Sequence, residues 1–250
     1  MKKQSTHGNS GQKPYTDSGF HNDQKSFTYE DFEGELDIPA EDILREPQAQ
    51  YSYHRQGEYT LEDYYALPDD QRVELIDGVF YLMDAPTVTH QYGLMDVCIQ
   101  LETYIRSQNG TCLALPSPVD VQLDCDDRTM VEPDIVVVCD WDKIINRCIY
   151  GAPDLVMEVL SPSTSRKDQT IKVKKYQNAG VREYWTIDIK KERVVVYDFA
   201  NDRAPAIYGI DQPVPVQIFD GKCRISFDRI YEKVRRVQEN ERRRADRGQN

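Results

Sequence analysis

Two short, strongly apolar runs constrain this chain more than any other feature of its sequence. Ile135–Cys139 reads Ile-Val-Val-Val-Cys, and Leu155–Leu160 reads Leu-Val-Met-Glu-Val-Leu. Short runs this rich in β-branched residues are typical of strands that are buried on both faces. Asp134 directly precedes the first run, and Glu158 lies inside the second. Because ionised side chains are costly in buried strands unless they are compensated, these two acids need a partner charge.

Between residues 60 and 107, the sequence predicts a short helix, a hairpin and a long helix. Thr60-x-x-Asp63 is typical of the start of a helix, here over Leu61–Ala66. The pair Asp77-Gly78 predicts a tight turn between two strands, Arg72–Ile76 and Val79–Met83. Apolar residues then recur at helical spacing from His90 to Ser107.

The rest of the sequence predicts strands followed by a helix, a second hairpin and a charged helix. The expected strands are Cys112–Leu115, Val119–Leu123, Ile135–Cys139 and Leu155–Leu160; a helix over Ser163–Ala179, a hairpin of Glu183–Ile189 with Arg193–Phe199, and a helical tail over Asp228–Arg247 follow. This order indicates an α/β (α+β) fold with a mixed central β-sheet flanked by helices.

Composition predicts one domain with two polar extensions. Residues 1–54 are rich in Ser, Gly, Gln, Asn and acids and read as a disordered or loosely docked leader. Residues 55–230 hold the apolar patterns of the folded domain, and 231–250 form a basic helical tail. The six cysteines contain no Cys-x-x-Cys pair and are expected to be reduced. With no secretory signal and no bilayer-length apolar run, the sequence favours the cytoplasm.

The net charge of −12 opposes binding to a polyanion. The charge is unevenly distributed, since residues 228–250 carry eight Lys/Arg against five Asp/Glu. Local geometry, rather than global charge, must therefore carry any argument for a nucleic-acid enzyme.

The two acids of the apolar runs point to a metal site. If the runs pair antiparallel, the start of the first lies beside the end of the second, and Asp134 meets Glu158. Two such carboxylates favour a cation between them, and Mg²⁺ suits hard oxygen ligands. The alternative is that Asp134 only caps the strand entry and that Glu158 faces solvent or an arginine.

A lysine in the following helix is placed to join the same cluster. Asp168, Lys172 and Tyr176 stand four residues apart and share one helical face, so Lys172 can point toward the carboxylates. The alternative is an ordinary solvated lysine in an i,i+4 pair with Asp168.

Several motifs together resemble the Uma2 family of restriction-endonuclease-like proteins, in the PD-(D/E)XK nuclease superfamily, also called DUF820. The resemblance covers about residues 58–230. The motifs are Glu74-Leu-Ile-Asp77-Gly78, His90, Ser117-Pro-Val-Asp120-Val, Pro133-Asp134-Ile-Val, Glu158-Val-Leu-Ser161-Pro162-Ser163-Thr164, Lys172-x-x-x-Tyr176 and Ala179-Gly-Val-Arg-Glu183-Tyr-Trp185-Thr-Ile-Asp188. Their order along the chain is more specific than any single motif.

The resemblance implies a restriction-endonuclease-like core and assigns roles to individual residues. Asp134 becomes the acid of the PD element and Glu158 the first acid of the (D/E)XK element, with both, and the backbone carbonyl of Val159, as metal ligands. The sequence departs from the superfamily pattern at Leu160, where a lysine is expected. Similar proteins supply the lysine from the next helix, which makes Lys172 the catalytic lysine. Glu74 would be a further catalytic acid.

Two assignments at the edge of the site stay open. His90 could approach the same cleft, but a lone histidine at the start of a buried helical face is more often a packing or capping residue. Phosphates could be contacted by the flanking residues Arg147, Tyr150, Arg166 and Lys167.

The implied activity is hydrolysis of phosphodiester bonds by an endonuclease that depends on Mg²⁺ or Mn²⁺, with nucleic acid, foremost DNA, as the partner. One alternative is a catalytically idle nuclease fold that binds DNA or regulates, which the acidic charge and the missing strand lysine favour. Another keeps hydrolysis but acts on RNA or a small phosphoester. No membrane partner is expected, and a homodimer stays open.

Overall fold

The computed structural model describes residues 55–68, 71–161 and 165–248 of the chain. The chain divides into two units, Met1–Ser52 and Tyr53–Asn250, and all described residues belong to the second. The polar leader expected at residues 1–54 lies outside the described residues. Within the described ranges, no helix combines the length and the apolar character needed to cross a bilayer.

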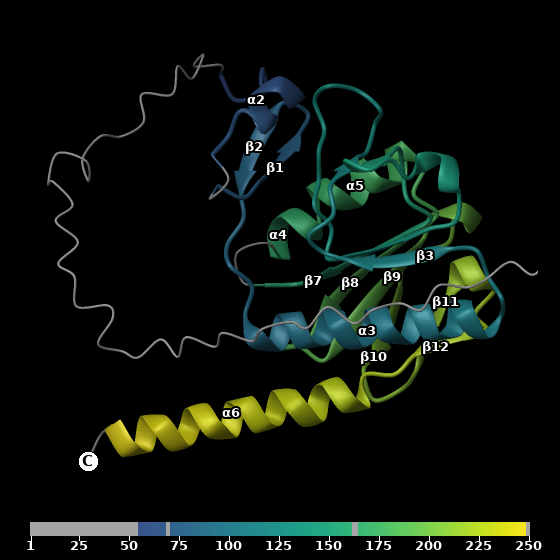
Figure 1. The fold of residues 1–250 in the computed structure, drawn as a ribbon. Helices are drawn as coiled ribbons and strands as arrows, with labels where there is room; N and C mark the ends of the chain where they lie inside the picture. Colours follow the sequence, from purple (N-terminus) through teal and green to yellow (C-terminus); the bar gives the residue numbers. More distant parts are fainter. Residues whose placement is uncertain (1–54, 69–70, 162–164, 249–250) are drawn as a thin grey trace, which may run out of the picture. The chain divides into compact units, whose positions relative to one another are not determined.

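A six-stranded mixed sheet forms the centre of the second unit (Figure 1). The strands lie in the order β10-β9-β8-β7-β5-β3, where β3 is Leu113–Pro116, β5 is Ile135–Val138, β7 is Leu155–Val159, β8 is Glu183–Asp188, β9 is Arg193–Asp198 and β10 is Ala206–Gly209. Strands β7 and β8 run parallel, and the other neighbouring strands of the sheet run antiparallel. The mixed central sheet expected from the sequence is confirmed.

Helices cover both faces of this sheet, which explains its unbroken apolar runs. Helix α3 (Val88–Ser107) lies on one face and α5 (Ile171–Ala179) on the other (Figure 1). Alternate strand residues therefore enter two different apolar clusters: Met157 packs in the α3-side cluster, and Val156 packs with Tyr176 in the α5-side cluster. Both clusters need apolar side chains, so β5 and β7 are buried along their whole length.

Smaller elements surround the central sheet. They are helix α2 (Leu61–Tyr65), the hairpin of β1 (Val73–Ile76) and β2 (Val79–Leu82), the pair β4 (Val121–Gln122) and β6 (Ile149–Tyr150), the pair β11 (Val214–Val216) and β12 (Cys223–Ile225), and the 3-10 turns η2 (Trp141–Lys143), η3 (Phe199–Asn201) and η4 (Gln217–Phe219). The predicted hairpin turn is confirmed: Asp77 and Gly78 both have positive φ, 51° and 78°. A bridge between Leu75 and Met130 ties this hairpin to the domain.

The helix expected over Ser163–Ala179 is interrupted. Residues 163–164 lie outside the described ranges, and the rest forms α4 (Ser165–Asp168) and α5, separated by a turn. Thr170 has a non-helical backbone (φ −129°, ψ −73°). The Asp168 carbonyl accepts a hydrogen bond from the Tyr184 hydroxyl at 3.0 Å. This contact ties the end of α4 to β8, which local sequence patterns do not reveal.

The expectation that all six cysteines are reduced is wrong for one pair. Cys112 and Cys139 form a disulfide, whereas Cys98, Cys125, Cys148 and Cys223 are free. Leu113 pairs with Val138 across β3 and β5, so the next position outward places the two cysteines opposite each other. Because strand pairing rather than sequence spacing brings them together, the absence of a Cys-x-x-Cys motif was not informative.

The expected C-terminal helix is present as α6 (Asp228–Gly248). Its first half packs on the domain, with Ile230 1% and Val234 7% exposed. Residues 238–247 are exposed, and this part of the helix extends past the sheet (Figure 1). Packing therefore holds the first half of α6, and the charged second half, residues 238–247, is exposed.

Two truncations of α6 should separate these halves. Deleting residues 228–250 removes the buried Ile230 and Val234, which should lower the free energy of unfolding by about 3–6 kcal/mol and the Tm by roughly 10 °C or more. Deleting residues 239–250 leaves the buried residues of α6 in place, since 239–247 are exposed, and should shift the Tm by less than about 2 °C. Thermal unfolding followed by circular dichroism checks both values. An equal loss from both truncations would contradict the division of α6.

Candidate active site

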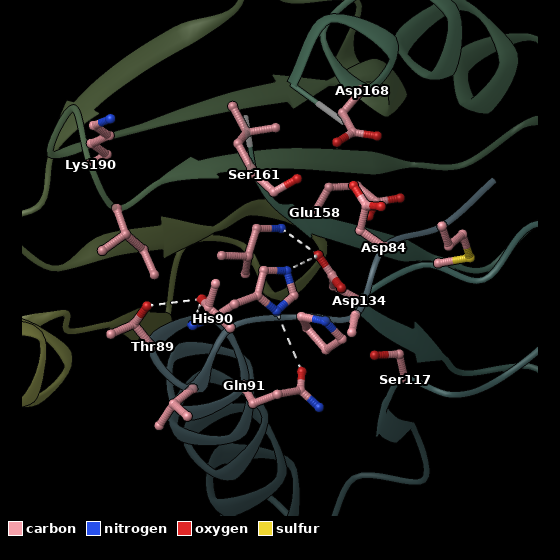
Figure 2. Close-up of a pocket in the computed structure, with 18 of the residues that line it drawn as sticks. Asp84, Thr89, His90, Gln91, Ser117, Asp134, Glu158, Ser161, Asp168 and Lys190 are labelled. Carbon is pink, nitrogen blue, oxygen red and sulfur yellow. Dashed lines mark hydrogen bonds and ion pairs between the residues drawn. The ribbon is translucent and has the colours of Figure 1, made fainter. Parts of the chain in front are cut away.

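Strand pairing places Asp134 opposite Glu158 in the interior of the central sheet, where β5 begins and β7 ends. Ile135 pairs with Met157 across the antiparallel β5 and β7, so the next position beyond that pair aligns Asp134 with Glu158. Cross-strand partners share one face of a sheet. Figure 2 shows both carboxylates lining the same pocket. The antiparallel pairing expected from the sequence is confirmed.

The ammonium of Lys172 lies among three acids from three separate elements. Its Nζ is 2.7 Å from Glu74 Oε1, 2.7 Å from Glu158 Oε1 and 3.5 Å from Asp168 Oδ1. The lysine is only 3% exposed, so these are contacts of a buried ion. Tyr176, one turn further along α5, donates its hydroxyl to Glu158 Oε1 at 2.9 Å. The helical face expected from the sequence therefore points at the strand acid.

Glu74 enters the site from strand β1. Its Oε2 is 2.5 Å from Lys167 Nζ on α4, and the backbone amide of Glu132 donates to its Oε1 at 3.3 Å. Lys167 had been expected only at the edge of the site. In a continuous helix, Lys167 and Lys172 would point about 140° apart. The turn between α4 and α5 instead directs both toward Glu74.

The pKa values of this cluster reflect burial and crowded charge. Burial, together with the charges of Asp168, Asp134 and Glu74, raises the pKa of Glu158 well above its usual range despite the opposing effect of Lys172. Burial also opposes ionisation of Glu74, but Lys172 and Lys167 outweigh it and hold the pKa of Glu74 below its ordinary value. The negative charge of Glu158 is therefore less well compensated than that of Glu74.

His90 reaches Asp134 from the first turn of α3. The ring Nε2 is 3.2 Å from Asp134 Oδ2, and the same oxygen accepts the Val159 amide at 2.7 Å (Figure 2). Burial lowers the pKa of His90, but the hydrogen bond and charge of Asp134 outweigh it and raise the pKa above its ordinary value. The backbone amide of His90 also bonds the N-cap Thr87. Thr87 is therefore the capping residue of α3, and the side chain of His90 is directed at Asp134 instead.

The donor set suits one hard divalent cation beside Asp134 and Glu158. Asp134, Glu158, Glu74 and Asp168 bring four carboxylates against the two ammonium groups of the lysines. Among the described residues, the side-chain contacts of Asp134 use Oδ2 and those of Glu158 use Oε1, which leaves the second oxygen of each carboxylate for a cation. In the described part of the chain, no three Asp, Glu, His or Cys side chains form a complete metal cage. Mg²⁺ needs none, because it binds through one or two carboxylates with water and substrate oxygens.

These groups line a cavity of about 990 Å³, a volume at the upper end of the range that is usual for ligand-binding pockets. Its walls include Glu74, Asp134, Glu158, Lys167 and Lys172, the start of α3 and the middle of α6.

The expectation that Arg147 and Tyr150 flank this site is wrong. The guanidinium carbon of Arg147 lies 3.2 Å from the ring centroid of Tyr65, and the Tyr150 hydroxyl donates to the Cys125 carbonyl. Neither lines the cavity. The side chain of Arg166 lies outside the described residues.

Comparisons with known proteins agree on a nuclease family. Residues 61–217 match the model of the Uma2 family, described as "Putative restriction endonuclease". The chain is similar to a crystal structure of a "putative nuclease belonging to DUF820" from Anabaena variabilis, with a TM-score of 0.57 and 22% identity over 69% of this chain and 97% of that chain. This likeness shows the fold. No curated protein matches the chain.

Replacing Lys172 with methionine should destabilise the protein, because Glu74 and Glu158 would be left buried without their shared cation. The expected loss in the free energy of unfolding is about 3–5 kcal/mol at pH 7. The pKa of Glu74 is lowered by the lysines, so its contribution is present above its ordinary value of 4.5 and is lost as pH falls through its folded value. The deficit should therefore shrink below about pH 4.5.

Urea unfolding at pH 7 and at pH 4 measures this deficit. The matched control is Lys174→Met on the exposed side of the same helix, which should change the unfolding free energy by less than about 0.5 kcal/mol. A Lys172→Met protein as stable as the control at pH 7 would contradict the buried ion cluster.

Proposed function

Since the chain belongs to the Uma2 family, we propose that it is a metal-dependent endonuclease that hydrolyses phosphodiester bonds, with DNA as its substrate. One observation carries the proposal: Asp134 and Glu158 align at the ends of paired strands, and the Lys172 ammonium lies 2.7 Å from Glu158. A carboxylate pair with an adjacent lysine is the combination that phosphoryl transfer needs, because negative charge must be held and neutralised in one place.

Asp134 and Glu158, with the backbone carbonyl of Val159, would hold Mg²⁺ or Mn²⁺ in this proposal. When bound, the ion polarises a phosphoryl oxygen and lowers the pKa of a coordinated water. Val159 follows Glu158 directly and donates its amide to Asp134, so it lies between the two acids. The raised pKa of Glu158 supports a cation at this place, because burial and neighbouring acids leave its charge poorly compensated.

Lys172 would orient the attacking water and offset negative charge that develops on the phosphate. The water oxygen forms a bond to phosphorus as the bond to the leaving sugar oxygen breaks. The water gives up one proton, and the leaving oxygen takes one, so no further reactant is needed. Glu74 and Asp168 also contact the ammonium and help to fix its position beside Glu158. Loss of one such electrostatic contact typically costs about 10²–10³-fold in rate.

An idle nuclease fold that binds DNA or regulates is the second candidate. It is supported by the way Lys172 already meets Glu74 and Glu158, because an ammonium in this place partly neutralises the acids without any metal. The two candidates differ in cleavage but not in binding.

Cleavage of supercoiled plasmid by the purified chain tests the proposal. Nicking should require Mg²⁺ or Mn²⁺, and Asp134→Asn should lower the rate by at least about 10²-fold, because the variant loses a charged ligand. The control is Asp142→Asn, an exposed acid in η2 beyond the other end of β5, which should retain full activity. DNA binding without nicking would favour the idle fold, and cleavage of RNA alone would reassign the substrate.

The exposed second half of α6, residues 238–247, should add to DNA binding. Arg242, Arg243, Arg244 and Arg247 are all exposed there, on a chain whose net charge otherwise repels a polyanion. A protein without residues 239–250 should bind duplex DNA more weakly and with a shallower dependence on salt, measured by fluorescence anisotropy from 50 to 200 mM salt. Unchanged affinity and salt dependence would show that this half of the helix is only a solvated tail.

A further inference from the structure

We propose that Glu74 is not a metal ligand but a positioning residue that holds two lysines, and that Lys167 contacts the substrate phosphate. The inference rests on the proposed function and deepens it, because it states how the same site meets a polyanion. It gives the acids two roles: Asp134 and Glu158 would hold a cation that is taken up, whereas Glu74 holds cations that the chain itself supplies.

Each oxygen of Glu74 already has a lysine beside it. Lys167 Nζ lies 2.5 Å from Oε2, and Lys172 Nζ lies 2.7 Å from Oε1. The carboxylate is fully buried, so water screens these charges little. A divalent ion placed against Glu74 would be repelled by both ammonium groups at close range. Asp134 and Glu158 differ, because their contacts with the described part of the chain use one oxygen of each carboxylate.

The two lysines are held to different degrees. Lys172 meets three acids, and its side chain is 4% exposed. Among the described residues, Glu74 is the acid that pairs with Lys167, whose side chain is 12% exposed. Lys167 also lines the cavity and lies 5.3 Å from the ring centroid of Tyr81. It can therefore exchange part of its pairing for a phosphate oxygen, while Lys172 stays fixed beside Glu158.

Duplex binding tests the role of Lys167. A fluorescent 30-base-pair DNA would be titrated with the full chain in Ca²⁺, with Lys167→Met compared with Lys174→Met. Losing one phosphate contact should reduce the slope of log affinity against log salt by roughly 0.9, and affinity at 50 mM salt should fall at least about threefold. Lys174→Met, which removes an exposed charge from α5, should match the wild type. Identical behaviour of the two lysine variants would overturn the assignment of Lys167.

Mn²⁺ binding without DNA tests the role of Glu74. Electron paramagnetic resonance titration should give Glu74→Gln an affinity within about twofold of wild type, whereas Asp134→Asn should weaken Mn²⁺ binding at least about tenfold. The Glu74→Gln protein should also lose DNA affinity to the extent that Lys167→Met does, and the double variant should lose little more, because both changes remove one coupled unit. Equal weakening of Mn²⁺ binding by Glu74→Gln and Asp134→Asn would overturn the positioning role.

These readouts do not depend on cleavage. If the binding results are as expected but the wild type never nicks DNA, the assignments of Glu74 and Lys167 stand and the nuclease activity fails. If the wild type nicks DNA but Lys167→Met binds DNA normally, the activity stands and the inference fails. A wild-type chain that binds neither Mn²⁺ nor the duplex overturns both.

Discussion

The rest of the site depends on one buried ammonium. Lys172 joins Glu74 on β1, Glu158 on β7 and Asp168 on α4, and of these three elements β1 is distant in sequence from the other two. Burying any one of these charges alone would be costly, but together they offset one another. The contacts that form the candidate active site therefore also join the central sheet to the β1–β2 hairpin and to helices α4 and α5. Folding and assembly of the site are one event in this arrangement.

The sequence predicted the elements whose signals are local. The Asp77-Gly78 turn, the periodic helix α3 and the apolar strands β5 and β7 each carry their pattern within a few residues, and all are present. The pairing of Asp134 with Glu158 was predicted on the condition that the two apolar runs pair antiparallel, and β5 and β7 meet that condition. What the sequence could not reveal was long-range: the turn between α4 and α5, stabilised by Tyr184, and the disulfide across β3 and β5.

The same division applies to the site residues. Lys172 was found because its spacing from Asp168 and Tyr176 marks one helical face. Lys167 was underestimated because helical periodicity directs it elsewhere, and only the break in the helix returns it to Glu74. His90 was ambiguous because a lone histidine in the first turn of a helix more often packs or caps, whereas here Thr87 is the cap and the His90 ring contacts Asp134. For each of these residues, the local sequence allowed two positions of the side chain, and a tertiary contact determined which one is present.

The position of the lysine has a consequence for how this site is built. A lysine at 160, where this chain has leucine, would project from β7 on the same face as Glu158, because alternate strand residues share a face. It would then belong to the sheet whether or not any helix were docked. Lys172 instead comes from α5, so its ammonium reaches Glu158 only when α5 lies on the sheet. Tyr176 contacts Glu158 from the same helix, and Tyr184 on β8 holds the end of α4. Docking of these two helices therefore supplies the lysine, and Glu158 lacks this compensating charge until it occurs.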